Sequence, residues 1–273
     1  MAIRLSSAVK SRVQSFLPAL SFGLARQRTE SLLSGVAAVV LGIRGCGWSP
    51  SVLNEAKGAA RWVNANEDFV VIDAGANVGS WMLAVRKYLP KSGRIYAFEP
   101  QPRAAEIIRA LRIHGCEVQQ AALSDRSGTI AFYTSDPTDT MGSLYERDDT
   151  IAHDHRKGYE SIEVETLRLD DFVKKHGVNR IDFMKMDLEG AELQALHGAT
   201  ECMQSGLLRA LSFEFGVSNV NSRTFFRDYF RLLSEHSYQI FRMTPAGHLI
   251  HVAEYSEDLE FFARTTTYFA RKT

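Results

Sequence analysis

The sequence predicts an α/β fold whose mostly parallel sheet of seven strands carries helices on both faces. Three observations lead to this prediction. From residue 69 onward, short apolar runs alternate with helical segments, as in parallel strands joined by helical crossovers. Glycines and acids follow several of these runs, where strands should end. Residues 1–66 have a helical pattern instead, which indicates an N-terminal helical extension ahead of a second domain at 67–273.

The elements are expected in a regular order along the chain. A helix should start at Ser49-Pro50, because serine can cap and proline is tolerated in the first turn. Strands are expected near residues 69–73, 94–98, 116–121, 181–186, 208–214, 237–242, 248–253 and 265–270. Helices are expected near residues 78–88, 102–113, 169–176, 190–204 and 222–235.

The segment 134–160 breaks this alternation. It is polar, rich in turn formers, and flanked by the strand-like runs TIAFYT and SIEVETL. A long loop between two paired strands fits, and such loops are usually functional. We expect a lid or a substrate loop. Further along, Pro245–Gly247 predicts a turn between two late antiparallel strands.

The composition is that of an ordinary soluble globular protein, with 45% hydrophobic and 23% charged residues. The 32 basic and 32 acidic residues cancel, so there is no basic excess to suggest a nucleic-acid partner. The three cysteines, Cys46, Cys116 and Cys202, form no CxxC pair. Neither a zinc ribbon nor a disulfide framework is suggested, and a reducing, cytoplasmic compartment is expected.

The N-terminus is the one biased region. Residues 1–29 contain five basic residues and no acid, and their apolar residues fall on one helical face. Such a segment fits a transit peptide or a peripheral membrane helix. The favoured interpretation is a helix that packs on the second domain or on a second copy of the chain. The longest apolar stretch, residues 32–43, is shorter than the roughly 20 residues of a membrane span.

The stretch VVIDAGANVGS, residues 70–80, has the pattern of a strand, a tight loop and a helix, which builds nucleotide sites in α/β folds. A phosphate-binding P-loop would need Lys and Ser or Thr after Gly79, and a dinucleotide loop would need glycine in place of Asn77. The carboxylate of Asp73, about 4 Å from a pyrophosphate, would oppose it by roughly 4 kcal/mol at an effective dielectric constant of 20. S-adenosylmethionine (SAM) has no phosphate and carries an ammonium and a sulfonium. The loop therefore favours SAM, with contacts from Asp73, Ala74, Gly75, Asn77 and Gly79.

Further polar residues follow later strands. Glu99, before Pro100, ends the second strand and can accept both ribose hydroxyls. Ser124 and Asp125 could reach an adenine edge, although an ordinary Asx-type turn remains an alternative. In IDFMKMDLEGAELQALHGA, residues 181–199, a buried strand ends at an acid and an acidic helix start follows. Its acids Asp187, Glu189 and Glu192 could serve the cofactor, a substrate hydroxyl or a metal, and Lys185 could neutralise one of them.

These segments, together with IYAFEPQP, QAALSD and TLRLDDFV, resemble the FkbM-type SAM-dependent methyltransferases over residues 68–215. KMDLEGAEL is the most specific part of the resemblance. It implies a Rossmann-like methyltransferase sheet with a final antiparallel strand inserted, and O-methylation of a sugar, glycolipid or other natural product. Trp81 departs from the family, which often has a smaller aromatic or polar residue there. By position, the resemblance places the methionine end at Asp73, Gly75, Asn77 and Gly79, the ribose at Glu99, the adenine near Asp125, and both cofactor and acceptor beside Asp187.

A hydroxyl acceptor is a poor nucleophile at neutral pH, so a general base is expected. The hypothesis is that an acid from the group 187–192, with or without a histidine of the 134–160 loop, deprotonates the acceptor. In such a charged loop, solvated histidines without a site role are the more common case, a metal held by the H-x-H pair is less favoured still, and no metal site is assigned. The candidates are Asp187, Glu189, Glu192, His153, His155 and Glu214.

Two other classes of function stay open. A nicotinamide-dependent oxidoreductase is disfavoured by Asp73 and Asn77. A non-catalytic SAM-binding module is disfavoured because Asp73, Gly75, Glu99 and Asp187 are all intact. Base methylation in a nucleic acid is a weaker interpretation, since DLEG stands where a (D/N)PP(Y/F) turn would be expected.

Overall fold

The computed structural model describes four stretches of the chain, residues 35–37, 39–65, 68–146 and 160–273. The chain divides into two compact units, of which the first ends at Arg44 and the second begins at Gly45. Within the first unit, residues 35–37 and 39–43 are helical. The predicted amphipathic helix of residues 1–29 lies outside the described residues.

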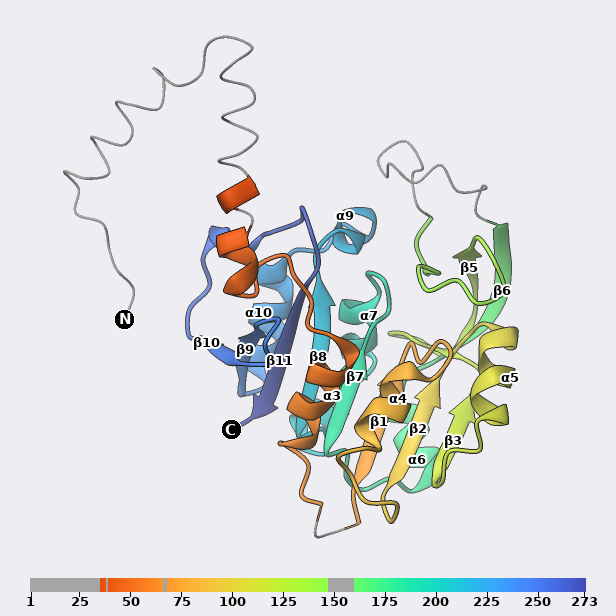
Figure 1. Ribbon diagram of the computed structural model, residues 1–273. Coiled ribbons are helices and arrows are strands. Elements are labelled where there is room, and N and C mark those ends of the chain that lie inside the picture. Colours follow the sequence, from red (N-terminus) through yellow and green to blue (C-terminus); the bar gives the residue numbers. More distant parts are fainter. Residues whose placement is uncertain (1–34, 38, 66–67, 147–159) are drawn as a thin grey trace, which may run out of the picture. The chain divides into compact units, whose positions relative to one another are not determined.

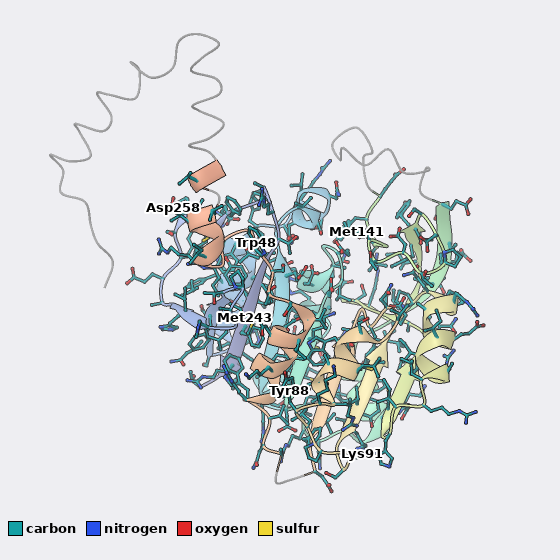
Figure 2. All side chains as sticks on the ribbon, viewed as in Figure 1. Trp48, Tyr88, Lys91, Met141, Met243 and Asp258 are labelled. Atoms are coloured by element: carbon teal, nitrogen blue, oxygen red, sulfur yellow. The ribbon has the colours of Figure 1, made fainter. Side chains whose placement is uncertain are left out.

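The second unit starts earlier than the boundary expected after residue 66. Helix α3 (Val52–Ala60) belongs to it, because Ala56 and Ala59 are buried in the same core as helix α4 (Ser80–Val85). Met243, labelled in Figure 2, belongs to strand β9 (Tyr238–Met243) of the sheet. It contacts α3, since a Cβ on Gly58 would lie 2.4 Å from the Met243 methyl group. The helix begins two residues later than Ser49-Pro50, since Ser51 is the N-cap and its hydroxyl accepts the Asn54 N–H at 3.3 Å.

The main sheet confirms the predicted α/β fold (Figure 1). Its strand order is β10-β9-β11-β8-β7-β1-β2-β3. The five strands from β8 to β3 are parallel, and the pairs β8–β11, β11–β9 and β9–β10 are antiparallel. The strands are β1 (Val70–Ala74), β2 (Arg94–Phe98), β3 (Cys116–Gln119), β7 (Phe183–Met186), β8 (Ala210–Phe215), β9 (Tyr238–Met243), β10 (Leu249–Val252) and β11 (Thr266–Lys272).

The last strand, β11, is inserted antiparallel between β8 and β9, as the family resemblance implied. The sheet has eight strands and not the expected seven, because β10 adds to its edge through a hairpin with β9. The turn of that hairpin lies where it was predicted. Gly247 has a φ of 80° there and donates its N–H to the Thr244 carbonyl at 2.8 Å.

A second, three-stranded sheet lies beside the carboxyl end of β3. It consists of β4 (Ala122–Leu123), β6 (Glu160–Leu167) and β5 (Gly128–Thr134), in that order. Strands β5 and β6 are antiparallel, so the two runs that flank segment 134–160 pair as predicted. The described start of that segment folds back along β5, where Ser143 and Tyr133 exchange backbone hydrogen bonds at 2.8 and 3.0 Å.

Helices cover both faces of the main sheet (Figure 1). One core joins the sheet to α6 (Leu169–His176), α7 (Glu192–His197), α8 (Thr200–Gln204) and α10 (Phe226–Glu235). The other joins it to α3, α4 and α5 (Pro102–Ala110). The predicted helix near 190–204 is therefore two helices, and the one near 222–235 is preceded by the separate short helix α9 (Ser218–Ser222).

Alternation along the strands decides which side chains face α3. Successive residues of a strand point to opposite faces. In β7, Phe183 belongs to the α3 core and Met184 to the other core, so Lys185 faces the α3 side. The same alternation puts Asp73 of β1 with Val71 on the α3 side, and Glu214 of β8 on that side too.

Candidate active site

A cavity of about 310 Å³ lies where the parallel strands β1, β2, β7 and β8 end. This edge is where open α/β sheets bind ligands. Its wall is formed by the loop after β1, the end of β2, the loop after β5, the loop after β7, strand β8 and helix α3. Among the described residues that line it, the charged ones are six acids and one lysine: Glu55, Glu99, Asp139, Asp187, Glu189, Glu214 and Lys185. The cavity therefore suits a cationic ligand.

The glycine loop turns sharply between β1 and α4. The N–H groups of Gly75 and Ala76 both donate to the carbonyl of Phe98, at 2.9 and 3.1 Å. Gly75 has a φ of 76°, and a Cβ there would lie 1.9 Å from the backbone oxygen of Asp187. Only glycine fits this approach of the two loops. Gly75 and Asn77 line the cavity, whereas Ala74 and Gly79 lie behind it.

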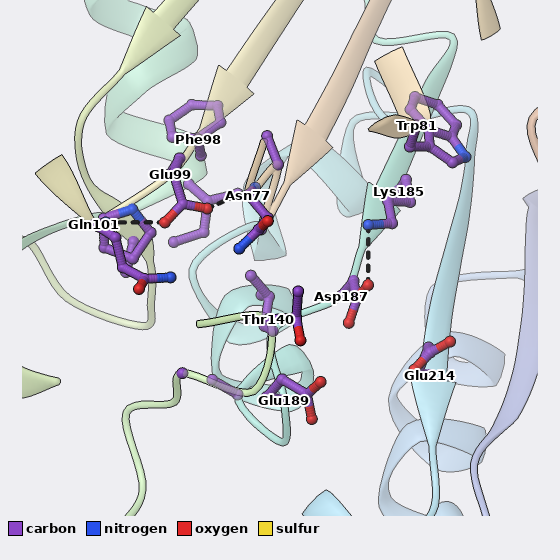
Figure 3. Close-up of a pocket in the computed structure, with 18 of the residues that line it drawn as sticks. Asn77, Trp81, Phe98, Glu99, Gln101, Thr140, Lys185, Asp187, Glu189 and Glu214 are labelled. Carbon is purple, nitrogen blue, oxygen red and sulfur yellow. Dashed lines mark hydrogen bonds and ion pairs between the residues drawn. The ribbon is translucent and has the colours of Figure 1, made fainter. Parts of the chain in front are cut away.

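Glu99 holds the loop in place from the end of β2. Its Oε2 accepts the N–H of Asn77 at 2.7 Å, and its Oε1 accepts the N–H of Gln101 at 2.9 Å (Figure 3). The side chain is only 2% exposed, and burial raises its pKa. Each carboxylate oxygen has two lone pairs, so Glu99 can still accept a hydrogen bond from a ligand hydroxyl. Glu99 and Pro100 both line the cavity.

The first part of the 134–160 loop forms another wall of the cavity. The Asn77 amide donates to the carbonyl oxygens of Thr138 and Asp139, at 3.2 and 3.3 Å. The Gln101 amide also donates to the Asp139 carbonyl, at 2.9 Å. Asp139 in turn accepts the N–H groups of Ser135 and Met141, at 2.9 and 2.8 Å. His153 and His155, predicted as candidates in the same loop, lie outside the described residues.

Asp73 does not lie at the cavity mouth, where the sequence placed it. It is fully buried on the α3 side of β1 and does not line the cavity. Burial raises the pKa of Asp73 to about 6, against the attraction of Lys185, whose Nζ lies 3.6 Å from Oδ1. Lys185 also contacts Oδ2 of Asp187 at 3.2 Å (Figure 3). The charge of Asp73 is thus matched within the protein, and Asp187 is the member of the group that lines the cavity.

Glu55 and Glu214 line the cavity on its α3 side. The Ser212 hydroxyl donates to Oε1 of Glu55 at 2.9 Å, and the Ser49 hydroxyl donates to Oε1 of Glu214 at 3.2 Å. Burial raises the pKa of Glu55 to about 7. Burial also raises the pKa of Glu214, and the nearby negative charges of Asp187 and Glu55 add to this rise.

Glu55 was missed by sequence reasoning, although a signal existed. It lies four residues before Ala59 on one helix face, and Ala59 is fully buried. A carboxylate on a buried helix face needs polar partners, so it marks a site or a structural pair.

Two acids after β7 differ in role. Glu189 lines the cavity and accepts the Ser218 hydroxyl at 2.8 Å. Glu192 does not reach the cavity, which corrects its place among the catalytic candidates. It is 1% exposed, and its two oxygens accept the N–H groups of Leu188 and Gly190, at 2.8 and 3.1 Å. Burial raises the pKa of Glu192 to about 8. Its contacts indicate that it shapes the loop after β7.

The polar adenine contacts predicted after β3 are not brought to the cavity. Ser124 is buried and donates its hydroxyl to Asp125 at 3.1 Å, and Asp125 itself is exposed. Neither residue lines the cavity. The cavity is lined by Ala122 and Leu123 instead, which make an apolar wall near Phe98.

The described part of the chain offers neither a cluster of metal ligands nor a membrane-spanning helix. No group of three or more His, Cys, Asp or Glu residues there is arranged to hold a metal ion. None of the helices described is long and apolar enough to cross a membrane.

The raised pKa of Glu55 leads to a pH prediction. A carboxyl group whose pKa is higher in the folded state binds its proton more tightly there. Its stabilising contribution is full below the unfolded pKa of about 4.3 and is lost as the pH rises through about 7. Glu55→Gln keeps an acceptor for Ser212 and removes the charge. We expect the variant to be about 1 kcal/mol more stable than the wild type at pH 8, and no more stable at pH 4.5. Urea denaturation at both pH values measures this, and an equal difference at the two would contradict it.

The fold and the cavity define the class: a Rossmann-like α/β protein with an acidic cavity at the carboxyl edge of its sheet. The Methyltransferase FkbM domain model matches residues 73–240, and the chain belongs to this family. The 2-O-methyltransferase NoeI of Sinorhizobium fredii is 32% identical over 145 residues, which cover 50% of this chain and 59% of that protein. The hexuronic acid methyltransferase AglP of Haloferax volcanii is 28% identical over 175 residues, covering 63% of this chain and 64% of that protein.

The chain therefore spans less than two thirds of the length of these relatives. Among solved structures, a human methyltransferase 10 domain containing protein aligns over 82% of each chain, with a TM-score of 0.44 and 11% sequence identity.

Proposed function

We propose that this protein transfers a methyl group from SAM to a hydroxyl of a sugar, glycolipid or other small natural product. The observation that carries the proposal is the charge of the cavity, where the described lining has six acids and a single lysine. SAM carries a sulfonium and an ammonium, whereas the pyrophosphate of a nicotinamide cofactor would meet only repulsion from these acids. Membership of the FkbM methyltransferase family supports the same function, and one relative is named as a 2-O-methyltransferase.

The residues of the cavity fit this cofactor. Glu99 would accept ribose hydroxyls with its remaining lone pairs. The apolar wall at Phe98 and Leu123 suits an adenine ring, and Gly75 with Asp187 would receive the methionine end. When bound, SAM supplies an electrophilic methyl group on its sulfonium.

Asp187 is the proposed general base. It lines the cavity, and its side chain is 37% exposed, while Lys185 fixes its Oδ2 at 3.2 Å. The Asp187 carboxylate would take the proton of the acceptor hydroxyl, whose oxygen would receive the methyl group. SAM would supply that methyl group and would leave as the neutral thioether, so atoms and charges balance. Alignment of the hydroxyl with the methyl group supplies much of the rate in such a step.

Asp187→Asn tests the proposal. The amide keeps the shape of the side chain but cannot take the proton, so we expect turnover to fall by about 10²-fold or more. The SAM dissociation constant, measured separately by calorimetry, should change less than about tenfold. Turnover is followed as transfer of a labelled methyl group to a panel of glycosides and polyols. Glu106→Gln, at a 61% exposed side chain on α5, is the control and should change neither quantity.

Two results would contradict the proposal. A loss of turnover smaller than about tenfold would remove Asp187 as the base. Binding of NAD in preference to SAM by the unaltered chain would replace the methyltransferase with an oxidoreductase.

A further inference from the structure

The α3 side of the cavity has a chemistry of its own. Glu214 of β8 lies across the cavity from Glu99, with Asp187 between them (Figure 3). Ser212, two residues before Glu214 on β8, faces the same side of the sheet and donates its hydroxyl to Glu55 at 2.9 Å, so Glu55 of α3 lies on this side too. If Glu99 takes the ribose, this far wall is left for the acceptor.

In Glu55 and Glu214, only one of the two carboxyl oxygens has a hydrogen-bond partner among the described residues. Each accepts one serine hydroxyl through its Oε1, from Ser212 for Glu55 and from Ser49 for Glu214. Within the described part of the chain, Oε2 of neither carboxyl group has a hydrogen-bond partner. Two carboxyl oxygens thus remain for the hydroxyl groups of a ligand, and a hydrogen bond to a carboxylate is stronger than one between neutral groups.

Trp81 adds a donor. It lines the cavity, is 3% exposed, and stacks on Phe183 with ring centroids 6.2 Å apart. Its indole Nε1 is buried and has no hydrogen-bond partner among the described residues. A buried donor of this kind is costly to leave unpaired. An acceptor oxygen, such as a ring or hydroxyl oxygen, would satisfy it.

The wall offers nothing to an anion. Lys185 is the only basic residue in the described lining, and it already pairs with Asp73 and Asp187. A carboxylate or phosphate next to the reacting hydroxyl would lose its water and gain only negative neighbours. A neutral polyol keeps all its hydrogen bonds, because its O–H groups donate to the free carboxyl oxygens.

We propose that Glu55, Glu214 and Trp81 form the acceptor subsite, and that they select an uncharged polyhydroxylated acceptor and reject uronates and sugar phosphates. This inference rests on the proposed function, since it names the acceptor class of the same cavity. Glu55 and Glu214 act here as specificity residues through direct hydrogen bonds to the acceptor.

The test uses the full chain and labelled SAM, with a panel of methyl hexosides and polyols as probes. Each scaffold is supplied as the neutral alcohol, as the carboxylate at the position of its primary alcohol, and as the phosphate ester at that position. We expect kcat/KM to be at least about tenfold higher for the neutral form of a scaffold than for either anion.

Two variants test whether Glu55 and Glu214 cause the preference for neutral over anionic acceptors. Glu55→Gln and Glu214→Gln each keep the shape of the side chain and remove an ionisable carboxyl group, so at pH 8, above the pKa of about 7 of Glu55, each should lower the ratio of neutral to anionic kcat/KM by about fivefold or more. The SAM dissociation constant should stay within about threefold of the wild-type value, since the cofactor lies on the Glu99 side. Glu106→Gln is the matched control on an exposed acid and should leave the ratio unchanged.

The outcomes separate this inference from the function on which it rests. Preference for a uronate or a phosphate, an unchanged ratio in both variants, or a chain that binds SAM but methylates no neutral scaffold of the panel would each overturn the acceptor subsite. Absence of SAM binding in the unaltered chain would instead overturn the proposed function.

Discussion

Replacing Gly75 by alanine is expected to abolish SAM binding and to lower the free energy of unfolding by about 3 kcal/mol or more. Two costs add at this position. The φ of 76° puts a non-glycine residue in the left-handed region, and the new Cβ would lie 1.9 Å from the Asp187 backbone oxygen. The loop after β1 cannot move alone, because Gly75 and Ala76 donate their N–H groups to the Phe98 carbonyl. The loop after β7 cannot move alone either, because the N–H of Asp187 donates to the Ala74 carbonyl at 3.1 Å.

Gly206 supplies the matched control. Its φ is 75°, and a Cβ there would meet nothing within 4 Å. Gly206→Ala therefore carries the backbone cost alone, about 1–2 kcal/mol, and should leave SAM binding intact. Urea denaturation gives the two stabilities, and calorimetry with SAM gives the two affinities. If both variants lose the same stability and both bind SAM, the approach of the loops after β1 and β7 is not what requires glycine.

This close approach gives the glycine a different role from the one expected. The sequence suggested only that Gly75 contacts the cofactor. In the structure, Gly75 first lets the Asp187 loop come near, and both residues then line the cavity. The location of the site was predictable, because parallel strands place their carboxyl ends at one edge. Glu99 and Asp187 follow directly from that rule.

The misplacement of Asp73 has a simple physical reason. It was placed by its distance along the chain from the glycines, but the direction of a strand side chain depends on alternation. Asp73 shares a face with Val71, which packs in the core under α3, so its carboxyl group is buried there. Alternation along β1 could have shown this, had the helix over that face been known.

Other site features needed the tertiary structure. Glu55 was assigned to an extension outside the domain, and its partner Ser212 lies 157 residues away in the sequence. For Glu192, the sequence cannot distinguish a carboxylate that faces a cavity from one that binds two backbone N–H groups of its own loop. Ser124 and Asp125 satisfy each other locally, which the composition of a turn does not reveal.

Lys185→Met is expected to destabilise the protein by about 3–5 kcal/mol at pH 8. The Lys185 side chain is 8% exposed and lies between the fully buried Asp73 and the partly exposed Asp187. Removing it leaves the charge of Asp73 buried without its counter-ion, which costs far more than the ion pair contributes. Asp187 also loses the contact that orients it, so the variant should lose turnover even where it remains folded.

The pH dependence identifies the cause. Burial already raises the pKa of Asp73 to about 6, and loss of the lysine raises that pKa further. A carboxyl group whose pKa is raised in the folded state stabilises the fold below its unfolded pKa of about 3.9. It loses that contribution as the pH rises through its folded-state pKa. The loss in free energy of unfolding caused by Lys185→Met should therefore be smaller at pH 5 than at pH 8. The double variant Asp73→Asn/Lys185→Met should recover most of it, since no unpaired charge remains buried.

Lys174→Met is the control, because it removes a lysine from an ion pair with a short N–O distance that is exposed to solvent and not buried. Lys174 lies 2.8 Å from Glu201, closer than Lys185 lies to either of its partners, but both side chains are more than half exposed. An exposed pair contributes at most about 1 kcal/mol. If Lys185→Met cost no more than Lys174→Met at pH 8, the carboxyl group of Asp73 would already be protonated in the wild type. Lys185 would then serve Asp187 alone, and its position beside the cavity would be explained by the orientation of the proposed base.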